Sequence, residues 1–309
     1  MTSAYDRKYR SLRDEDEFHV RFLDTFQGRN PRSTNGCTVI APLTCIQYFC
    51  ADERNSISST PSETNAWENG IPDELINFVI DEHAAAVLPD VRSKLNLEGD
   101  AFIIPSDVHD HLIEVGLLST SQFVGVCGGN ILDDKHLASF KNSLLLLGDE
   151  RERERLKGRK VAATLFFHGH VVALHVVDGC QDGEARVELI DSLPDPETWV
   201  DPPEPRPITR VSSDSMDCVD ERRDPSEDGE WERPAEHELE EHELPQNAVR
   251  VRCMGVDHFD TLVRQYACSK FSEEEREFID DTAWDDENNY SDSAFDPRIF
   301  QAFIWAEAE

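Results

Sequence analysis

The chain has 309 residues, a formal net charge of −34 and no run of about 20 consecutive apolar residues. Its length is enough for one large hydrophobic core or two modest ones, and the lack of a long apolar run argues against a membrane span. The strong negative charge would repel phosphates, so we expect neither nucleic acid nor an anionic membrane as a partner.

The first 24 residues are interpreted as an N-terminal extension, and they contain no apolar stretch typical of a secretion signal. Eight cysteines are scattered along the chain without a C-x-x-C pair or a repeated spacing. These features predict reduced thiols in the cytoplasm or the nucleus rather than a secreted protein held by disulfides.

One cysteine differs from the others because it follows a glycine turn at the start of an apolar segment. The sequence Asn35-Gly36-Cys37 leads into residues 38–51, which are mainly apolar and are expected to form a buried helix. A helix N-terminus offers unpaired N–H groups and the positive end of the helix dipole, which favour a thiolate over a thiol. Cys37 is therefore the candidate nucleophile. Pro42 lacks an N–H group, so we expect this helix to kink or to begin later.

The region between the cysteine and residue 147 has mainly helical patterns. Apolar residues recur on one face over 72–80, 106–115 and 133–147, with a shorter segment over 119–126. We therefore expect a helical region of about 100 residues behind the nucleophile helix.

Other thiols and imidazoles of this region are expected to be structural. Cys45 and Cys50 lie in the apolar run, which predicts buried core thiols. His109 and His111 are two positions apart on an expected helix, so their side chains point in different directions and are expected at the surface.

The pattern then changes to segments rich in β-branched and aromatic residues, over 160–167, 170–177 and 186–192. The last two are predicted to form an antiparallel hairpin. Folding this hairpin about Gln181 places His170 opposite Asp191 or Ser192, at one edge of the sheet.

That arrangement suits a cysteine nucleophile, which needs an imidazole within hydrogen-bond reach. The imidazole in turn needs an acceptor that fixes its tautomer and orientation. His170 with Asp191 meets both needs. In the same register His175 would lie opposite Val187, which offers no acceptor, and His168 precedes the strand and is the main rival as the base.

Residues 194–247 carry 18 acidic residues against 5 arginines together with frequent proline, which predicts a disordered acidic insertion. A short helix is feasible over 235–244. Beyond the insertion we expect a strand over 248–253, a helix over 257–271, and an apolar tail that docks as a helix or a strand. Residues 248–309 would thus complete the core.

The order of these residues resembles that of the papain-like cysteine peptidase superfamily. The segments Asn35-Gly36-Cys37, Gly169-His170-Val171-Val172 and Ile190-Asp191-Ser192-Leu193 carry the resemblance. It implies an α+β fold with a catalytic core over 25–193, in which the nucleophile helix of a helical lobe packs on a small antiparallel sheet carrying histidine and aspartate. It also implies an oxyanion donor upstream of the cysteine. Gln27 is that candidate, and Asn30 and Asn35 are the alternatives.

The implied activity is a thiol-dependent hydrolase that cleaves a peptide or isopeptide bond, with no cofactor and no metal. A protein or peptide is the expected substrate. The deubiquitinating branches, which act on ubiquitin-like proteins, and bacterial or eukaryotic peptidases with aspartate as the third residue resemble this chain more than papain does. An acyltransferase or a transglutaminase-like enzyme shares the order of cysteine, histidine and aspartate. A non-catalytic scaffold that recruits partners through its acidic segment and apolar tail is the third alternative.

Two other sets of residues have the composition of known binding sites. His168, His170, His175 and Cys180 are residue types that bind zinc, but they lack the paired spacing of most zinc sites. The glycines over 125–129 lack the Lys-Ser/Thr that follows in a phosphate-binding loop.

Overall fold

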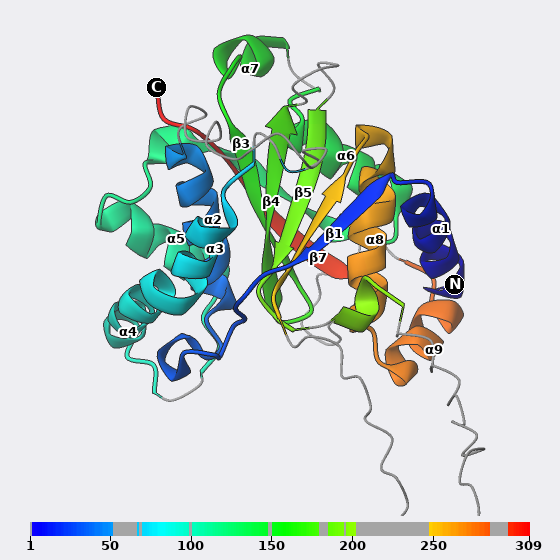
Figure 1. The fold of residues 1–309 in the computed structure, drawn as a ribbon, viewed down its shortest axis with the longest axis horizontal. Coiled ribbons are helices and arrows are strands. Elements are labelled where there is room, and N and C mark those ends of the chain that lie inside the picture. The colour runs from blue at the N-terminus through cyan, green and yellow to red at the C-terminus, as the bar shows by residue number, and fades with distance from the viewer. Residues whose placement is uncertain are drawn as a thin grey trace, which may run out of the picture.

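A seven-stranded antiparallel sheet lies at the centre of the structure (Figure 1). The structure is a computed structural model, and it describes residues 2–51, 67, 70–98, 101–147, 150–178, 185–194, 196–201, 247–284 and 296–309. The strands are β1 (Phe18–Phe22), β2 (Phe123–Asn130), β3 (Val161–Phe167), β4 (His170–Asp178), β5 (Ala185–Asp191), β6 (Val249–Cys253) and β7 (Ile299–Ala306). Their order in the sheet is β1-β6-β5-β4-β3-β7-β2.

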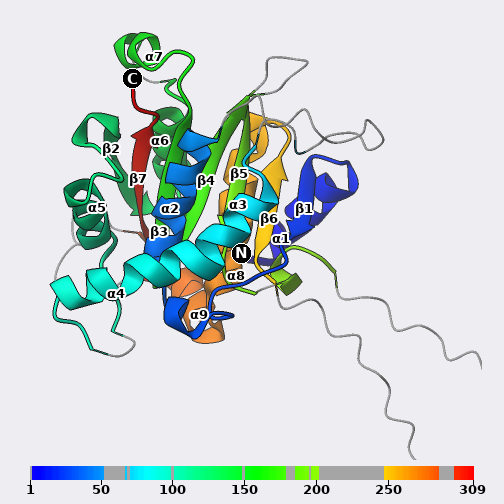
Figure 2. The same ribbon diagram turned by 60° about the vertical axis from the view of Figure 1, so that its left-hand side comes forward.

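Helices cover both faces of this sheet (Figures 1 and 2). One face carries α2 (Cys37–Cys50), α3 (Asp73–Phe78), α4 (Ala84–Lys94) and α5 (Pro105–Glu114). The other face carries α1 (Thr2–Asp14), α6 (Asp134–Leu144), α8 (Phe259–Lys270) and α9 (Glu273–Asp281). The short helix α7 (Glu150–Arg155) precedes β3. In the described part of the chain, no helix combines the length and the apolar character that a membrane crossing requires.

The strands send alternate side chains into two hydrophobic cores. In β3, Val161, Leu165 and Phe167 join the core beneath α1, α6 and α8, whereas Ala162 joins the core beneath α2. Because both faces are buried, the central strands are apolar at nearly every position, which explains their continuous rather than alternating pattern. The mixed fold of helices and an antiparallel sheet agrees with the expectation from the sequence.

Helix α2 lies against β3 and β4 and is apolar on all sides. Val39, Leu43 and Cys45 are almost completely buried, so the helix occupies the centre of its core rather than the surface. The helix begins at Cys37 and not later, and Pro42 lies inside it. Proline has no N–H group, so Pro42 leaves one hydrogen bond of the helix unmade.

The β4–β5 hairpin forms as expected, but its register differs by one residue. His175 lies opposite Glu188 and Ala173 lies opposite Ile190, so the expected pairing of His175 with Val187 is wrong. The register of a hairpin depends on its turn. Residues 179–184, which connect the two strands in the sequence, are outside the described residues.

The C-terminal segment completes the sheet. Residues 248–253 and 257–271 match β6 and α8, and the apolar tail becomes β7, which lies between β3 and β2. The segment over 119–126, expected within the helical region, begins with a short 3-10 helix over Thr120–Gln122 and continues into strand β2 from Phe123. Its glycines and valines favour neither a helix nor a strand clearly. The segment becomes a strand because it pairs with the apolar tail.

The N-terminal segment belongs to the same fold. Strand β1 pairs with β6 at the edge of the sheet, and Tyr9 of α1 enters the core below α8. The Tyr9 hydroxyl donates to the carbonyl of Trp199, 3.2 Å away. Trp199 is fully buried, so the expectation of disorder is wrong for residues 196–201, because a large aromatic side chain anchors them. The rest of the expected insertion, including 202–246, lies outside the described residues.

Three smaller expectations are also corrected. His109 and His111 are both buried rather than at the surface, because α5 is covered by the chain on more than one side. Cys50 is exposed rather than buried, since it is the last residue of α2, whereas Cys45 is buried as expected.

Candidate active site

Cys37 is the first residue of α2, where backbone N–H groups lack partners within the helix. Gly36 precedes it, and the carbonyl of Gly36 accepts from the N–H of Ile40 at 2.8 Å. A Cβ atom on Gly36 would lie 2.7 Å from the carbonyl oxygen of Ser33. Only glycine therefore allows the preceding turn to approach closely enough to place Cys37 at the helix N-terminus.

The sulfur of Cys37 has a buried polar environment. The side chain is 6% exposed, and its sulfur is hydrogen-bonded with His170 and with the backbone groups of Thr38 and Val171. Burial on its own raises the pKa of the thiol, but the charge of His170 and these hydrogen bonds outweigh burial and leave the pKa below its ordinary value. The site therefore favours a thiolate.

His170 connects this sulfur to Asp191. Its Nε2 lies 2.7 Å from Oδ1 of Asp191, which leaves the other ring nitrogen, Nδ1, for Cys37. Burial opposes the charged imidazole, but Asp191 and Cys37 outweigh burial and raise the pKa of His170 to about 9. Burial likewise opposes the charged form of Asp191, and His170 overcomes this to lower the Asp191 pKa to about 2. The three groups thus favour a thiolate, an imidazolium and a carboxylate.

Two further groups hold the Asp191 carboxylate. The N–H of Leu193 donates to Oδ1 at 2.9 Å. The other oxygen, Oδ2, lies 3.6 Å from Nζ of Lys270, the last residue of α8. No local pattern singles out Lys270, because it lies 79 positions beyond Asp191 in the sequence and comes near it through the packing of α8 on the sheet.

Gln27 lies next to this group of residues. Its N–H donates to the carbonyl of Ser192 at 2.7 Å, and its Oε1 accepts from the Ser192 hydroxyl at 3.0 Å. Ser192 directly follows Asp191, so Gln27 is fixed beside the end of β5. Because Oε1 is held by Ser192, the Nε2 group is available as a donor to a bound ligand.

The alternative donors are arranged differently. Asn35 is exposed and has a φ of 54°, which belongs to the turn before Cys37. Asn30 uses both ends of its side chain elsewhere: Oδ1 accepts from the N–H of Arg32 at 3.0 Å, and Nδ2 donates to the carbonyl of Asp81 in the helical segment Val79–His83. Gln27 is therefore the candidate that the structure places next to the His170–Asp191 pair.

The rival histidines have other partners. His168 is in a turn with a φ of 55°, and its Nε2 lies 2.8 Å from Oε1 of Glu275. His175 is fully buried and stacks on Tyr48, with 4.4 Å between ring centroids. Burial lowers the pKa of His175 to about 3, so this imidazole is neutral. Of the three, His170 is the one in contact with Cys37.

A metal centre has little support from the described residues, which contain no group of three or more His, Cys, Asp or Glu side chains that could hold a metal ion. Cys180, one of the zinc ligands considered above, lies outside the described residues. His168, His170 and His175 have separate surroundings, as described above.

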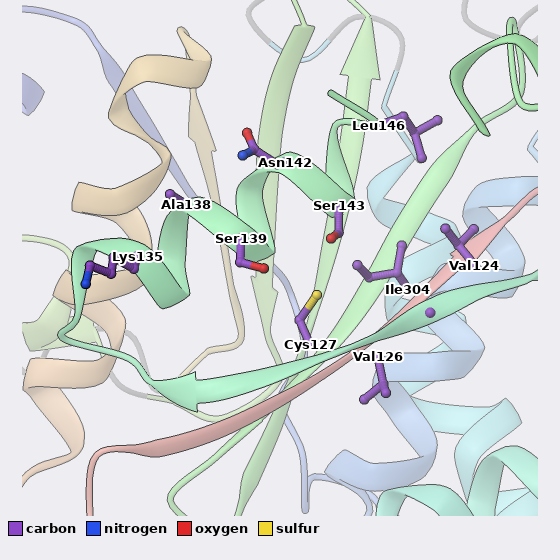
Figure 3. A pocket seen from close by; sticks show the side chains of 11 residues that line it. Val124, Val126, Cys127, Lys135, Ala138, Ser139, Asn142, Ser143, Leu146 and Ile304 are labelled. Carbon is purple, nitrogen blue, oxygen red and sulfur yellow. The ribbon is translucent and has the colours of Figure 1, made fainter. Parts of the chain in front are cut away.

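A cavity of about 550 Å³ lies elsewhere, between β2 and α6 (Figure 3). Cys127 points into it from β2, and Ser139 and Ser143 line it from α6. None of Cys37, His170, Asp191 and Gln27 lines this cavity, so it is separate from the residues described above.

No protein-family model matches the chain, and no curated protein matches it. The functional interpretation therefore depends on the geometry of Cys37, His170 and Asp191.

Proposed function

We propose that the protein is a thiol-dependent hydrolase that cleaves a peptide or isopeptide bond through an acyl-enzyme on Cys37. The observation that carries this proposal is the buried chain of contacts from the Cys37 sulfur to His170 and from His170 to Asp191 at 2.7 Å. A nucleophile, a base in contact with it and a group that orients the base are the parts that such catalysis requires.

Each residue has a defined role in this reaction. The Cys37 thiolate attacks the carbonyl carbon, and the His170 imidazolium then donates its proton to the leaving amine. Neutral His170 next takes a proton from water, which attacks the thioester and releases the acid. Asp191 keeps the imidazole oriented through both steps.

The negative charge on the carbonyl oxygen needs hydrogen-bond donors during both steps. The N–H of Cys37 is at a helix N-terminus, where the helix supplies no acceptor. The Nε2 group of Gln27 is the second donor in this proposal, held through its contacts with Ser192.

The substrate class follows from the resemblance to papain-like cysteine peptidases, which include enzymes that act on ubiquitin-like proteins. The order of Cys37, His170 and Asp191, and the antiparallel sheet that carries the last two, support it. A cytoplasmic or nuclear location belongs to the same proposal. Transfer of the acyl group to an amine instead of water would use the same residues, and a product assay separates the two reactions.

Labelling with iodoacetamide tests the nucleophile. At neutral pH we expect Cys37 to be alkylated far faster than the exposed Cys50, as measured by mass spectrometry of peptides, because the pKa of Cys37 is lowered. His170→Ala should remove this preference. Equal alkylation of both thiols in the unmodified chain would overturn the proposal.

A ubiquitin derivative with an electrophilic C-terminus tests the substrate class. We expect a covalent adduct with the full chain and none with Cys37→Ser. A chain that is labelled by iodoacetamide at Cys37 but not by this probe would retain its reactive thiol and exclude ubiquitin as the substrate.

A further inference from the structure

A lysine from a distant part of the chain reaches the far side of the Asp191 carboxylate. Nζ of Lys270 lies 3.6 Å from Oδ2, and the two side chains are only 14% and 1% exposed. Among the described residues, Oδ2 accepts no hydrogen bond, whereas Oδ1 accepts from both His170 and Leu193. The ammonium group of Lys270 is thus the charge that compensates the second carboxylate oxygen.

The fold holds Lys270 in this place. It is the last residue of α8, and its Nζ lies 5.4 Å from the centroid of the Tyr266 ring one turn earlier. Tyr266 is fully buried in the core between α8 and the sheet. The lysine stem therefore lies along packed apolar surface, and the charged end is directed to the sheet edge that carries Asp191.

We infer that Lys270 is a positioning residue of this site, which fixes the Asp191 carboxylate and sets the pH range in which Cys37 is a reactive thiolate. This inference rests on the proposed function of Cys37 and extends it to a fifth residue, beyond Cys37, His170, Asp191 and Gln27. In this inference Lys270 acts through its contact with Asp191.

The titratable groups around Asp191 come from three other elements. They are Cys37 on α2, His170 on β4 and Lys270 on α8. His170 and Lys270 lie on opposite oxygens of the same carboxylate, and both lower its pKa.

The sign of the effect follows from charge alone. A fixed positive charge favours the deprotonated form of every group near it. Removing the charge of Lys270 therefore raises the pH at which the Cys37 thiol loses its proton, and it also raises the pH at which the His170 imidazolium does so. If Lys270 served only as packing, an uncharged side chain of similar length in its place would leave the pKa values of Cys37 and His170 unchanged.

The experiment uses Lys270→Met and Lys270→Arg in the full chain. Methionine keeps the apolar stem and removes the charge, and arginine keeps the charge. The rate of Cys37 alkylation by iodoacetamide is measured from pH 4 to pH 9. For Lys270→Met we expect the profile to move to higher pH, with a rate roughly 3- to 10-fold lower on its acidic side, which corresponds to a shift of roughly 0.5 to 1 pH unit. Lys270→Arg should restore the original profile.

Lys270→Gln serves as a second uncharged variant, and thermal unfolding shows which variants fold. If a folded, uncharged variant keeps the original pH profile and its Cys37 stays selectively reactive, the inference about Lys270 is overturned and the proposed function is not. Loss of selective labelling in the unmodified chain would instead overturn the proposed function. A lower rate without any shift along the pH axis would also overturn the inference, since it would show a structural role only.

Discussion

Nε2 of His170 lies 2.7 Å from Oδ1 of Asp191, although the two residues do not face each other in the hairpin ladder. The paired register continues from Ala173 opposite Ile190, so Asp191 lies diagonally across from His170 at the end of β5. Diagonal neighbours on one face of a sheet are within reach when their side chains are long enough. The contact also joins two groups whose pKa values move apart, to about 9 for His170 and about 2 for Asp191.

This pair should make stability depend on pH in a defined way. The pKa of Asp191 is depressed, so its charge stabilises the fold above the ordinary value of 3.8, and this contribution is lost as the pH falls towards 2. The pKa of His170 is raised, so its contribution is complete below the ordinary value of 6.5 and is lost as the pH rises through about 9. The coupled pair is therefore most stabilising between these two ranges.

Asp191→Asn tests this window, because it removes the charge and keeps the size of the side chain. We expect the unmodified chain to exceed the variant in free energy of unfolding at pH 6, with a smaller difference at pH 3 and at pH 10. Urea unfolding at each pH measures the difference. The exposed Asp110→Asn is the matched control and should show no such maximum. A constant difference for Asp191→Asn would contradict the coupling.

A second buried ion cluster stabilises the sheet away from Cys37. Oε1 and Oε2 of Glu188 lie 2.6 Å from the guanidinium groups of Arg250 and Arg252, and all three side chains are at most 1% exposed. The arginines outweigh the burial of Glu188 and lower its pKa to about 2. Because both carboxylate oxygens of Glu188 contact arginines, Glu188 does not accept a hydrogen bond from His175, which lies opposite it in the hairpin.

Glu188→Ala should therefore destabilise the protein strongly. It leaves two buried guanidinium groups without their shared carboxylate, a change that typically costs about 3 to 5 kcal/mol in free energy of unfolding. Chemical unfolding at neutral pH measures this cost. Glu150→Ala, at an exposed position of α7, is the control and should change stability by less than about 0.5 kcal/mol. A similar small effect for both variants would show that the cluster contributes little.

The sequence was informative where the pattern is local. The strands over 160–167 and 170–177 were located to within a residue or two, because β-branched and aromatic residues form continuous runs there. The positions of Cys37 and His170 at the ends of their elements follow from the same patterns. The register of the hairpin differs by one residue from the expected one, because both strands are largely apolar on both faces and their pattern does not distinguish one register from the next.

Contacts between residues far apart in the chain could not be predicted from the sequence. Lys270 reaches Asp191 because α8 packs on the sheet, and Trp199 is buried because it packs against Tyr9 of α1 in the core. Strand β2 depends on pairing with β7, a segment about 170 positions further along the chain. Such contacts depend on tertiary packing, which overrides local preference.

The role of Gln27 can be separated from that of Asn35 by comparing two substitutions. Gln27 is fixed by Ser192 beside Asp191, whereas Asn35 is exposed in the turn before Cys37. If Nε2 of Gln27 stabilises the oxyanion, Gln27→Ala should lower kcat for hydrolysis of an activated ester by about 10²- to 10³-fold. The rate of Cys37 alkylation should stay within a few-fold of its original value, since alkylation forms no oxyanion. Asn35→Ala and the exposed Gln301→Ala are the controls, and neither should change kcat appreciably. A large loss in Asn35→Ala with little change in Gln27→Ala would assign the donor to Asn35 instead.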